Sequence, residues 1–431
     1  MSLCTPAKIH QGKNLPIQCD IAFICLCPMP EIFKEYQDCR IRRYKERYFL
    51  QLHPKHVAFC SYKGKKFVVC AEVYGGPVTV SIVEELHYYG VSTIVGIGFV
   101  GSLSIKFSIG SNLNVNKALS ESGTTPHYIK DAFKSDWVSS DWDFSLLDPI
   151  TKLESVECWT TNAIYREYLS DVNKFRELGC DVVNMDTSHL FASCRLLNMF
   201  YGYVCTVSDV LNEEWENHLS NAVNTNESKG ESIVLTQQRK LISSILENIN
   251  VITTAKDQQD QLRLSYIRNS VIAFFIEKNI CKSHDINHID RCSDMLNKVL
   301  INDPSLSQQI KFSLHVAVLL HDVDDGKFVT NENYDNARNI LRLHNVCREL
   351  EDQIIEIISY ISSSKNGDSI PEKAEDKEYL LYPRFVDRLD AIGVHGVIRC
   401  YQFTKTKSNP LFLESTLIPS EHSDKEYEGS L

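Results

Sequence analysis

The sequence predicts an α/β domain followed by an all-helical domain. Two observations support this division of the 431 residues: short β-branched and apolar runs alternate with helical periods in the first half, and only helical periods follow Thr254. Alternation of strands with helices is typical of α/β domains, whereas helices without strands pack as bundles. The length agrees with two or three domains, because one domain takes about 150 residues.

The predicted strands of the first half are apolar along almost their whole length, which is typical of strands that are covered on both faces. They span residues 20–26, 56–60, 66–73, 92–98, 180–185 and 202–207. The helical periods span residues 80–89, 163–178, 187–199 and 231–250. The last of these has its apolar residues on one side and is expected to close the first domain, so a boundary is predicted between residues 255 and 261.

The second half contains helical periods and no convincing strand. These periods span residues 262–279, 289–299, 310–321, 333–344, 349–362 and 382–403. We therefore expect the first domain at residues 1–255 and the second at residues 262–417. Residues 418–431 are polar and charged and are expected to form a disordered tail.

Composition excludes several classes of function. Lysine plus arginine (45) against aspartate plus glutamate (56) gives a net charge of −11, whereas nonspecific binding of nucleic acid requires clustered positive charge. No apolar run reaches the ~18 residues that a membrane span needs. The fifteen cysteines are scattered and form no C-x-x-C pair. Reduced thiols in a cytoplasmic protein, with no nucleic-acid or membrane partner, are therefore expected.

Three segments of the first half place ligand-binding residue types at the ends of predicted strands. They are V-G-I-G-F-V-G-S-L at 95–103, S-G-T-T-P-H-Y at 122–128, and V-V-N-M-D-T-S-H-L-F at 182–191 with C-T-V-S-D at 205–209. The glycines of the first allow backbone to approach a ligand closely. In the third, one strand carries Met185 and Asp186 to its carboxyl end, and another carries Ser208 and Asp209. Strand ends are where α/β sheets bind ligands, although a single aspartate there is more often a helix cap.

Together and in this order, these segments resemble the nucleoside phosphorylase family, which includes purine nucleoside and uridine phosphorylases. The resemblance covers residues 19–250 and includes Gly75-Gly76-Pro77 ahead of a helix. It implies a mixed sheet with flanking helices and cleavage of a purine N-glycosidic bond in a nucleoside or nucleotide. It also implies a homo-oligomer, with inorganic phosphate as a candidate nucleophile.

The resemblance implies roles for individual residues. Asp209 matches the catalytic acid that protonates the purine ring, a role that needs a carboxyl group with a raised pKa. Asp186 stands where the family has a glutamate that binds the ribose hydroxyls. The further substrate-binding matches are His127, Tyr128, Ile164 within the base-contacting segment 161–165, Met185 and Ser208.

The sequence departs from this family at the phosphate site. The N-terminal phosphate motif is replaced by L-C-P-M-P at 26–30, the usual arginine by Gly96, and a small hydroxyl residue by Phe99. Loss of one such anion donor typically costs about 3 kcal/mol of transition-state stabilisation. The basic run at residues 40–47 either replaces part of the lost phosphate contacts or forms a solvated face of the protein. The nucleophile is therefore phosphate or water, or the domain binds nucleosides without turning them over.

Histidine and aspartate recur at wide spacing in the helical half. They are His288 in S-H-D-I-N-H-I-D-R-C, His321 and Asp322 in L-L-H-D, and Asp387 in P-R-F-V-D-R-L-D-A-I-G. A His-Asp dipeptide within an apolar helix is costly unless both groups are paired or bind a metal. Several helices that each contribute such a residue form the kind of metal site found in helical bundles.

This pattern resembles the HD-domain metal-dependent phosphohydrolases over residues 262–413 and implies an all-α HD-domain bundle. The resemblance implies a divalent metal held by His288, His321, Asp322 and Asp387. The mixed ligands leave Mn, Fe, Co, Ni, Mg and Zn open. Lys327 is expected to hold phosphate and Asp325 to act as general acid or base. Arg291 and Arg388 are expected to contact phosphate or to pair with groups behind the metal ligands.

The two resemblances together imply a two-domain enzyme of nucleoside and nucleotide breakdown. The second domain would hydrolyse a phosphate ester or anhydride, and the first would cleave the glycosidic bond of the product. The alternative is a phosphohydrolase that is regulated by a catalytically impaired, nucleoside-binding first domain. The sequence leaves the nucleobase and the number of phosphates open.

Overall fold

The computed structural model describes residues 4–37, 46–120, 123–129, 137–142, 153–212, 215–218, 232–278, 280, 286–326, 333–344, 346–362 and 366–406. Contacts within the chain divide it into two compact units, Met1–Asp260 with Ser307–Gln309, and Gln261–Leu306 with Ile310–Leu431. Three features predicted from the sequence lie outside the described residues: Lys327, the polar tail, and most of the basic run that begins at residue 40.

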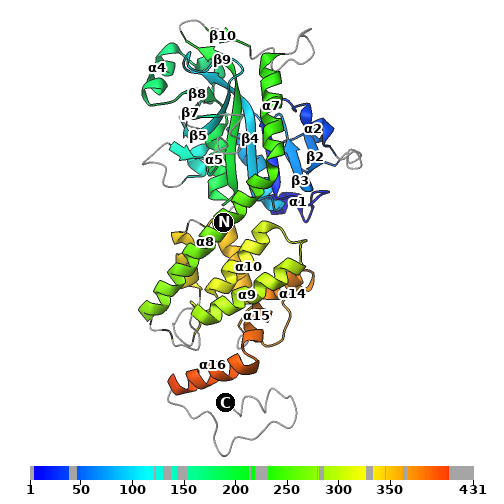
Figure 1. The fold of residues 1–431 in the computed structure, drawn as a ribbon, viewed down its shortest axis with the longest axis vertical. Coiled ribbons are helices and arrows are strands. Elements are labelled where there is room, and N and C mark those ends of the chain that lie inside the picture. Colours follow the sequence, from blue (N-terminus) through cyan, green and yellow to red (C-terminus); the bar gives the residue numbers. More distant parts are fainter. Residues whose placement is uncertain are drawn as a thin grey trace, which may run out of the picture. The chain divides into compact units, whose positions relative to one another are not determined.

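The first unit is built on one mixed sheet (Figure 1). Its described strands are β1 (Ile21–Leu26), β2 (Val57–Tyr62), β3 (Lys65–Cys70), β4 (Thr93–Ser102), β5 (Asn112–Ser120), β6 (Trp137–Ser139), β7 (Glu154–Thr160), β8 (Val182–Asn184), β9 (Phe200–Leu211) and β10 (Trp215–Asn217). The order is β10-β9-β5-β7-β8-β4-β1-β3-β2, with β6 paired to β5. Strand β9 also pairs with β4, so β4, β9, β5, β7 and β8 close into a ring.

Parallel and antiparallel pairs coexist in this sheet. Strand β1 runs parallel to β3 and β4, β4 runs parallel to β9, and β7 runs parallel to β5 and β8. Strands β2 with β3, β4 with β8, and β5 with β9 are antiparallel. The mixed nucleoside phosphorylase-like sheet expected from the sequence is therefore confirmed.

Helices cover both faces of the sheet. On one face, α3 (Gly76–Tyr88) and α5 (Thr187–Leu196) contribute to one apolar cluster. On the other face, α2 (Ile32–Glu35) and α7 (Ile233–Glu247) contribute to another. Alternate residues of β1 enter the two clusters, Ala22 and Ile24 the first, Phe23 and Cys25 the second. Coverage of both faces explains why the predicted strands are apolar throughout.

The glycines of β4 accommodate an aromatic side chain. The strand runs without a break through Gly96 and Gly98, and the ring of Tyr203 from β9 lies over both. A Cβ atom at Gly96 would meet the Tyr203 ring at 2.5 Å and Leu190 at 2.6 Å, and a Cβ atom at Gly98 would overlap the Tyr203 hydroxyl. The space that the sequence suggested for a ligand at these glycines is therefore filled by the core.

The second unit is helical, as predicted, and no strand occurs in its described residues. Its helices are α8 (Ile249–Lys278), which begins in the first unit, α9 (Ile286–Asn302), α10 (Gln308–Leu320), α11 (Asp335–Leu343), α12 (Arg348–Ser359), α14 (Glu372–Glu375), α15 (Tyr382–Asp390) and α16 (Gly393–Thr406), with the 3₁₀ segment η8 (Glu378–Leu381). Residues of α8 to α15 share one apolar cluster. The period at 382–403 is divided because Gly393 adopts a positive φ of 69°.

Two properties of the described chain bear on its environment. No described helix has both the length and the apolar composition needed to cross a membrane. The described cysteines are all free thiols, and only Cys4 and Cys400 among them are exposed.

We expect Gly96→Ala to lower the free energy of unfolding by about 1–3 kcal/mol, because the added methyl group overpacks the core against Tyr203 and Leu190. Urea unfolding followed by tryptophan fluorescence measures this effect in the first unit, where all four tryptophans lie. In a Tyr203→Leu background the same change should cost less. Equal stability of Gly96→Ala and the parent protein would show that the glycine does not serve packing.

Candidate functional site

A buried carboxyl group marks the carboxyl end of β8. Asn184, the last residue of β8, accepts hydrogen bonds through Oδ1 from the backbone N–H groups of Asp186 and Thr187, each at 3.2 Å. Because Asn184 caps the start of α5, the Asp186 carboxylate is available for another contact. Its Oδ1 accepts a 2.6 Å hydrogen bond from the backbone N–H of Gly75, whose φ is +78°. Asp186 is 5% exposed.

Burial raises the pKa of Asp186 to about 7, and the hydrogen bond from Gly75 opposes this shift only in part. A carboxyl group of this kind exchanges its proton near neutral pH. The protein thus holds a titrating group at the strand end where the sequence predicted ribose binding.

A hydroxyl–imidazole network joins the segment 122–128 and Asn162 to this strand end. His189 of α5 contacts the Thr125 hydroxyl through Nδ1 at 2.7 Å and Asn162 Oδ1 through Nε2 at 3.2 Å. Burial lowers the pKa of His189 to about 4, so the ring is neutral at pH 7. A Cβ atom at Gly76 would meet both His189 and Thr124 at 2.7 Å. The glycine turn, the segment 122–128 and the start of α5 therefore meet at one locus.

The predicted substrate-binding residues of this locus differ in exposure. His127 is exposed, and Tyr128 and Met185 are half-buried. Burial and the neighbouring Glu84 raise the pKa of Tyr128 above its usual range. Ile164 lies in the 3₁₀ segment η6 (Ile164–Arg166) and is 38% exposed.

A bulge in β9 sets the position of Asp209. Val100 pairs with Val207 and Gly101 pairs with Asp209, so Ser208 is the extra residue of β9. The Ser208 hydroxyl donates to Asp209 Oδ1 at 2.7 Å, and the indole N–H of Trp215 donates to Oδ2 at 3.0 Å. Bulges next to active sites often redirect a side chain in this way.

Glu167 is a second carboxyl group close to Asp209. Burial and the charge of Asp209 raise the pKa of Glu167 to about 8. Sequence reasoning identified neither Glu167 nor Trp215 as a site residue. Glu167 lies two residues beyond the base-contacting segment 161–165, which was the nearest signal in the sequence.

Gly101 separates the two carboxyl loci. It pairs with Val183 of β8 on one side and with Asp209 of β9 on the other. A Cβ atom at Gly101 would lie 3.2 Å from both Val183 Cγ1 and Asp209 Oδ2. The ends of β8 and β9 that carry Asp186 and Asp209 are therefore neighbours across β4.

The region that corresponds to the family's phosphate site is apolar in its described part. Phe99 and Met29 both pack against the cluster under α2 and α7. Cys27 Sγ accepts a contact at 3.4 Å from the Gln238 amide, and Tyr203 covers Gly96. Phe99 thus lies on the face of β4 opposite to Tyr203.

The histidines and aspartates of the helical unit converge on one point. His288 is on α9, His321 and Asp322 directly follow α10, and Asp387 is on α15. The two Nε2 atoms of the histidines are 3.2 Å apart. Asp387 Oδ1 lies 3.2 Å from His288 Nε2 and 3.7 Å from His321 Nε2, and Asp322 lies 3.4–3.7 Å from the same atoms. All four predicted metal ligands are therefore together.

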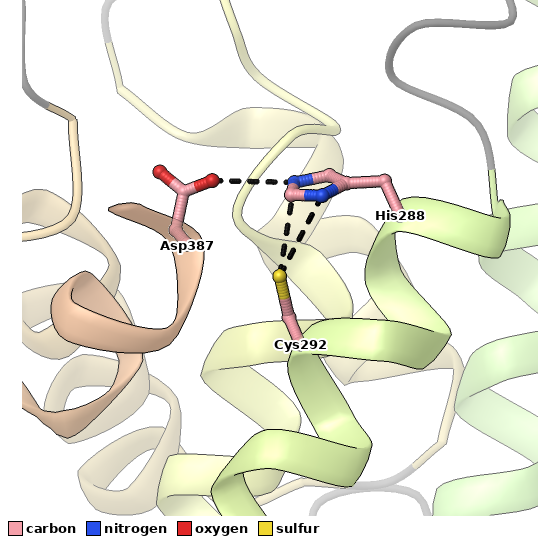
Figure 2. Close-up of side chains that lie close together, drawn as sticks. All are labelled: His288, Cys292 and Asp387. Atoms are coloured by element: carbon pink, nitrogen blue, oxygen red, sulfur yellow. Dashed lines mark hydrogen bonds and ion pairs between the residues drawn. The ribbon is translucent and has the colours of Figure 1, made fainter. Parts of the chain in front are cut away.

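Cys292 also contacts His288. Figure 2 shows His288 between Asp387 and Cys292, whose Sγ lies 3.6 Å from Nδ1 and 3.9 Å from Nε2. The thiol is also within hydrogen-bonding distance of the Val386 carbonyl, at 3.7 Å. The Cys292 contact was not predicted from the sequence, although Cys292 lies one turn after His288.

The charges of this cluster stabilise one another. Burial opposes a positive charge on His321, but Asp322 and Asp387 outweigh it and raise the pKa of His321 to about 10. Burial opposes a negative charge on Asp387, but the neighbouring His288 and His321 hold its pKa well below the usual range. Nitrogen and oxygen atoms of His288, His321, Asp322 and Asp387 thus surround one centre.

The other predicted residues of the helical unit lie around this cluster. Asp325 is half-buried in the turn after Asp322. Arg388 donates to Asp368 Oδ1 at 2.6 Å and to the Gly367 carbonyl. Arg291 donates to Asp390 rather than to a metal ligand, with bonds of 2.6 and 2.8 Å.

Known proteins resemble the first unit. A 42% identical, uncharacterised protein of Acanthamoeba polyphaga mimivirus aligns over 255 residues, which are 57% of this chain and 98% of that protein. A uridine phosphorylase of Haemophilus influenzae is 24% identical over 42% of this chain and 78% of its own length. A solved uridine phosphorylase of Vibrio fischeri has a TM-score of 0.43 at 20% identity, over 56% of this chain and 98% of that chain.

The family comparison covers the sheet and most of its helices. The model of the phosphorylase superfamily matches residues 22–238, which extend from β1 into α7 and include Asp186, Asp209 and the Gly75-Gly76 turn. This match spans half of the chain. The chain belongs to the phosphorylase superfamily.

Proposed function

We propose that the protein is a two-domain enzyme of nucleoside and nucleotide breakdown. The first unit cleaves the N-glycosidic bond of a purine nucleoside, and the helical unit hydrolyses a phosphate ester or anhydride with a divalent metal. The family membership and the convergence of Asp186, the Gly75-Gly76 turn and the segment 122–128 support the first activity. The cluster of His288, His321, Asp322 and Asp387 supports the second.

In the first unit, Asp186 would bind the ribose hydroxyls, and Asp209 would direct a proton to the leaving base. Asp209 is held by Ser208 and Trp215, and Glu167 beside it keeps its own proton up to about pH 8. A neutral carboxyl group beside Asp209 is a suitable proton source for a base that leaves as an anion. We therefore add Glu167 to Asp209 as a candidate proton-transfer residue.

The helical unit fits a divalent cation on two observations. His321 Nδ1 lies 2.8 Å from the Val318 carbonyl and His288 Nδ1 lies 2.7 Å from Asp390, so both Nε2 atoms can present lone pairs to the centre. Asp322 Oδ2 is buried and has no hydrogen-bond partner. Imidazoles with carboxylates favour transition metals such as Mn, Fe, Co, Ni or Zn over Mg.

A metal held by these four residues would polarise a phosphoryl oxygen and supply a hydroxide nucleophile near neutral pH. The chain's own residues would orient the substrate. Asp325 would hold or move a proton at the attacked phosphate, and Lys327 and Arg388 would contact its oxygens. Incubation with nucleosides and nucleotides and several divalent metals, with chromatography of the products, tests both activities.

A second candidate function is regulatory. The packing of Tyr203 over Gly96 and of Phe99 with Met29 favours a first unit that binds a nucleoside without cleaving it. Such a unit would act as a sensor for the phosphohydrolase. A nucleoside that alters phosphohydrolysis without releasing its base would support this alternative.

We expect Asp186→Asn to stabilise the protein at pH 8 by about 2–4 kcal/mol, since a pKa raised to about 7 reflects the cost of a buried charge at about 1.4 kcal/mol per unit. Between about pH 4 and pH 7 the folded state keeps a proton that the unfolded state has lost, so stability falls as the pH rises. Asparagine avoids this loss and can still accept from Gly75. Urea unfolding at pH 4 and pH 8 measures the difference.

The exposed Glu177→Gln provides the control for this experiment and should show no such gain at pH 8. Equal effects of Asp186→Asn at both pH values would contradict the buried charge. Base release should fall in Asp186→Asn even though the protein is more stable, because Asp186 is placed to bind the ribose.

We expect His321→Ala and Asp322→Asn each to weaken Mn²⁺ binding at least 100-fold and to abolish phosphohydrolysis, because the first removes a ligand atom and the second removes a carboxylate charge from the cluster. Equilibrium dialysis with metal analysis measures the binding. His315→Ala is the control, since His315 lies in α10, which ends just before His321, and outside the cluster. Full metal occupancy in the His321→Ala, Asp322→Asn double variant would refute the ligand assignment.

We expect base release from purine nucleosides to be independent of added phosphate, because Gly96 stands in place of the family's phosphate-binding arginine and the Tyr203 ring covers this glycine. The sugar product, identified by chromatography, should be free ribose. Phe99→Ser alone should not create phosphate dependence, since an arginine is also missing at Gly96. Formation of ribose 1-phosphate from a nucleoside and phosphate would show a phosphorylase instead.

A further inference from the structure

Asp390 connects the histidine cluster to two arginines. Its Oδ2 lies 2.7 Å from His288 Nδ1. Arg291 donates to both carboxylate oxygens at 2.6 and 2.8 Å, and Arg399 donates to Oδ2 at 3.1 Å. The Asp390 side chain is 3% exposed. One buried carboxylate thus joins α9, α15 and α16 behind the cluster.

The two arginines identify Asp390 as a carboxylate. Arg291 donates to both of its oxygens in a two-point pair and Arg399 adds a third bond, so both oxygens serve as acceptors. An ionised carboxylate only accepts hydrogen bonds. The partner atom His288 Nδ1 must therefore carry a proton.

This requirement decides which nitrogen of His288 is available to a cation. With the proton on Nδ1, the lone pair of a neutral ring is on Nε2, the atom that faces His321, Asp387 and Asp322. His321 is oriented in the same sense by a different acceptor, the Val318 carbonyl. A backbone carbonyl is insensitive to side-chain substitution, so the orientation of His288 is the one that a substitution can test.

We propose that Asp390 is a positioning residue that holds His288 as its Nδ1–H tautomer and thereby directs the Nε2 lone pair into the metal site. The inference rests on the proposed metal-binding function of the helical unit. Asp390 lies behind the histidine and is not itself a ligand. Carboxylates that orient metal-binding histidines in this way typically affect metal affinity 10- to 100-fold.

Asp390→Ala should remove the control over the tautomer. Without the carboxylate, His288 Nδ1 loses the acceptor that Asp390 supplies, and the ring can carry its proton on Nε2, where the proton blocks the cation. Asp390→Asn is the conservative variant. Because Oδ2 accepts from Arg291, Arg399 and His288 together, an amide oxygen at this position keeps these bonds and the proton on Nδ1.

Asp290→Ala, on the helix α9 that carries His288, is the control. Asp290 accepts from Arg268 through both oxygens at 2.7 and 2.6 Å, the same two-point geometry that Arg291 makes with Asp390. Asp290 makes no contact with His288 among the described residues. An effect on the metal that came from the loss of any arginine-paired carboxylate near His288 would therefore appear in Asp290→Ala as well.

The test measures Mn²⁺ affinity by electron paramagnetic resonance of the free ion, and the histidine tautomer by ¹⁵N NMR of the metal-free chain. We expect Asp390→Ala to weaken Mn²⁺ binding 10- to 100-fold and Asp290→Ala to change it less than twofold. The NMR signals of His288 should move from the Nδ1–H pattern to the Nε2–H pattern only in Asp390→Ala. Asp390→Asn, which keeps an acceptor for Nδ1, should retain the parent pattern and most of the affinity.

Unchanged Mn²⁺ affinity in a folded Asp390→Ala protein would overturn the proposal. If Asp390→Ala does not fold, an Nε2–H tautomer of His288 in the parent chain would overturn it equally. If the parent chain binds no divalent metal, the proposed metal function fails, and the NMR measurement still decides whether Asp390 sets the tautomer.

Discussion

Strand β4 has to serve as a partner for three other strands at once. It pairs with β1 along one edge, with β9 along the other, and with β8 at its last two residues. Helices cover both of its faces, so there is little room for side chains on β4. Gly96, Gly98 and Gly101 fit because they have no Cβ atom. The pairing of Gly101 with both Val183 and Asp209 brings the two carboxyl loci to the same end of the sheet. The position of the site is thus a consequence of how the sheet closes.

The helical unit has the opposite constraint, because it must keep charged groups inside its core. Asp322 and Asp390 are nearly inaccessible to solvent, as is His288, while the surrounding cluster is apolar. Such groups are stable only when each is paired or binds a cation. Asp390 is fully compensated by two arginines and His288, whereas Asp322 retains an oxygen without a hydrogen-bond partner. The contrast between the two aspartates distinguishes a supporting residue from a candidate ligand.

The parts of the fold that followed from the sequence are those with strong local patterns. The buried strands β1, β3 and β9 read as apolar runs, and α9 and α12 as clear helical periods. Strand β5 was missed because Asn112, Asn114, Asn116 and Lys117 interrupt its apolar pattern. In the structure it is flanked by β7 and β9, and Asn114 donates to the Ser155 hydroxyl, so tertiary pairing overrides propensity.

The candidate sites show the same limit. The histidine and aspartate pattern of the helical unit is local enough to be recognised, and the structure brings its members together. Glu167 has no such pattern, and its importance depends on Asp209, which lies 42 residues later. Asp390 acquires its contacts only when Arg291 and Arg399 fold around it. The orientation of Phe99 could have been predicted from the sequence. Side chains alternate between the two faces of a strand, so Phe99 lies on the same face of β4 as Val95 and Ile97, opposite to Gly96.

The burial of most described thiols determines which cysteines react with chemical reagents. Burial raises the pKa of Cys19 and of Cys60 to about 12 and raises the pKa of Cys70 further still. Alkylating and oxidising agents react with the thiolate, which these residues almost never form in the folded state. Among the described cysteines, only Cys4 and Cys400 are exposed. Of the cysteines that the structure describes, a maleimide dye or spin label would therefore attach to these two first, one in each compact unit.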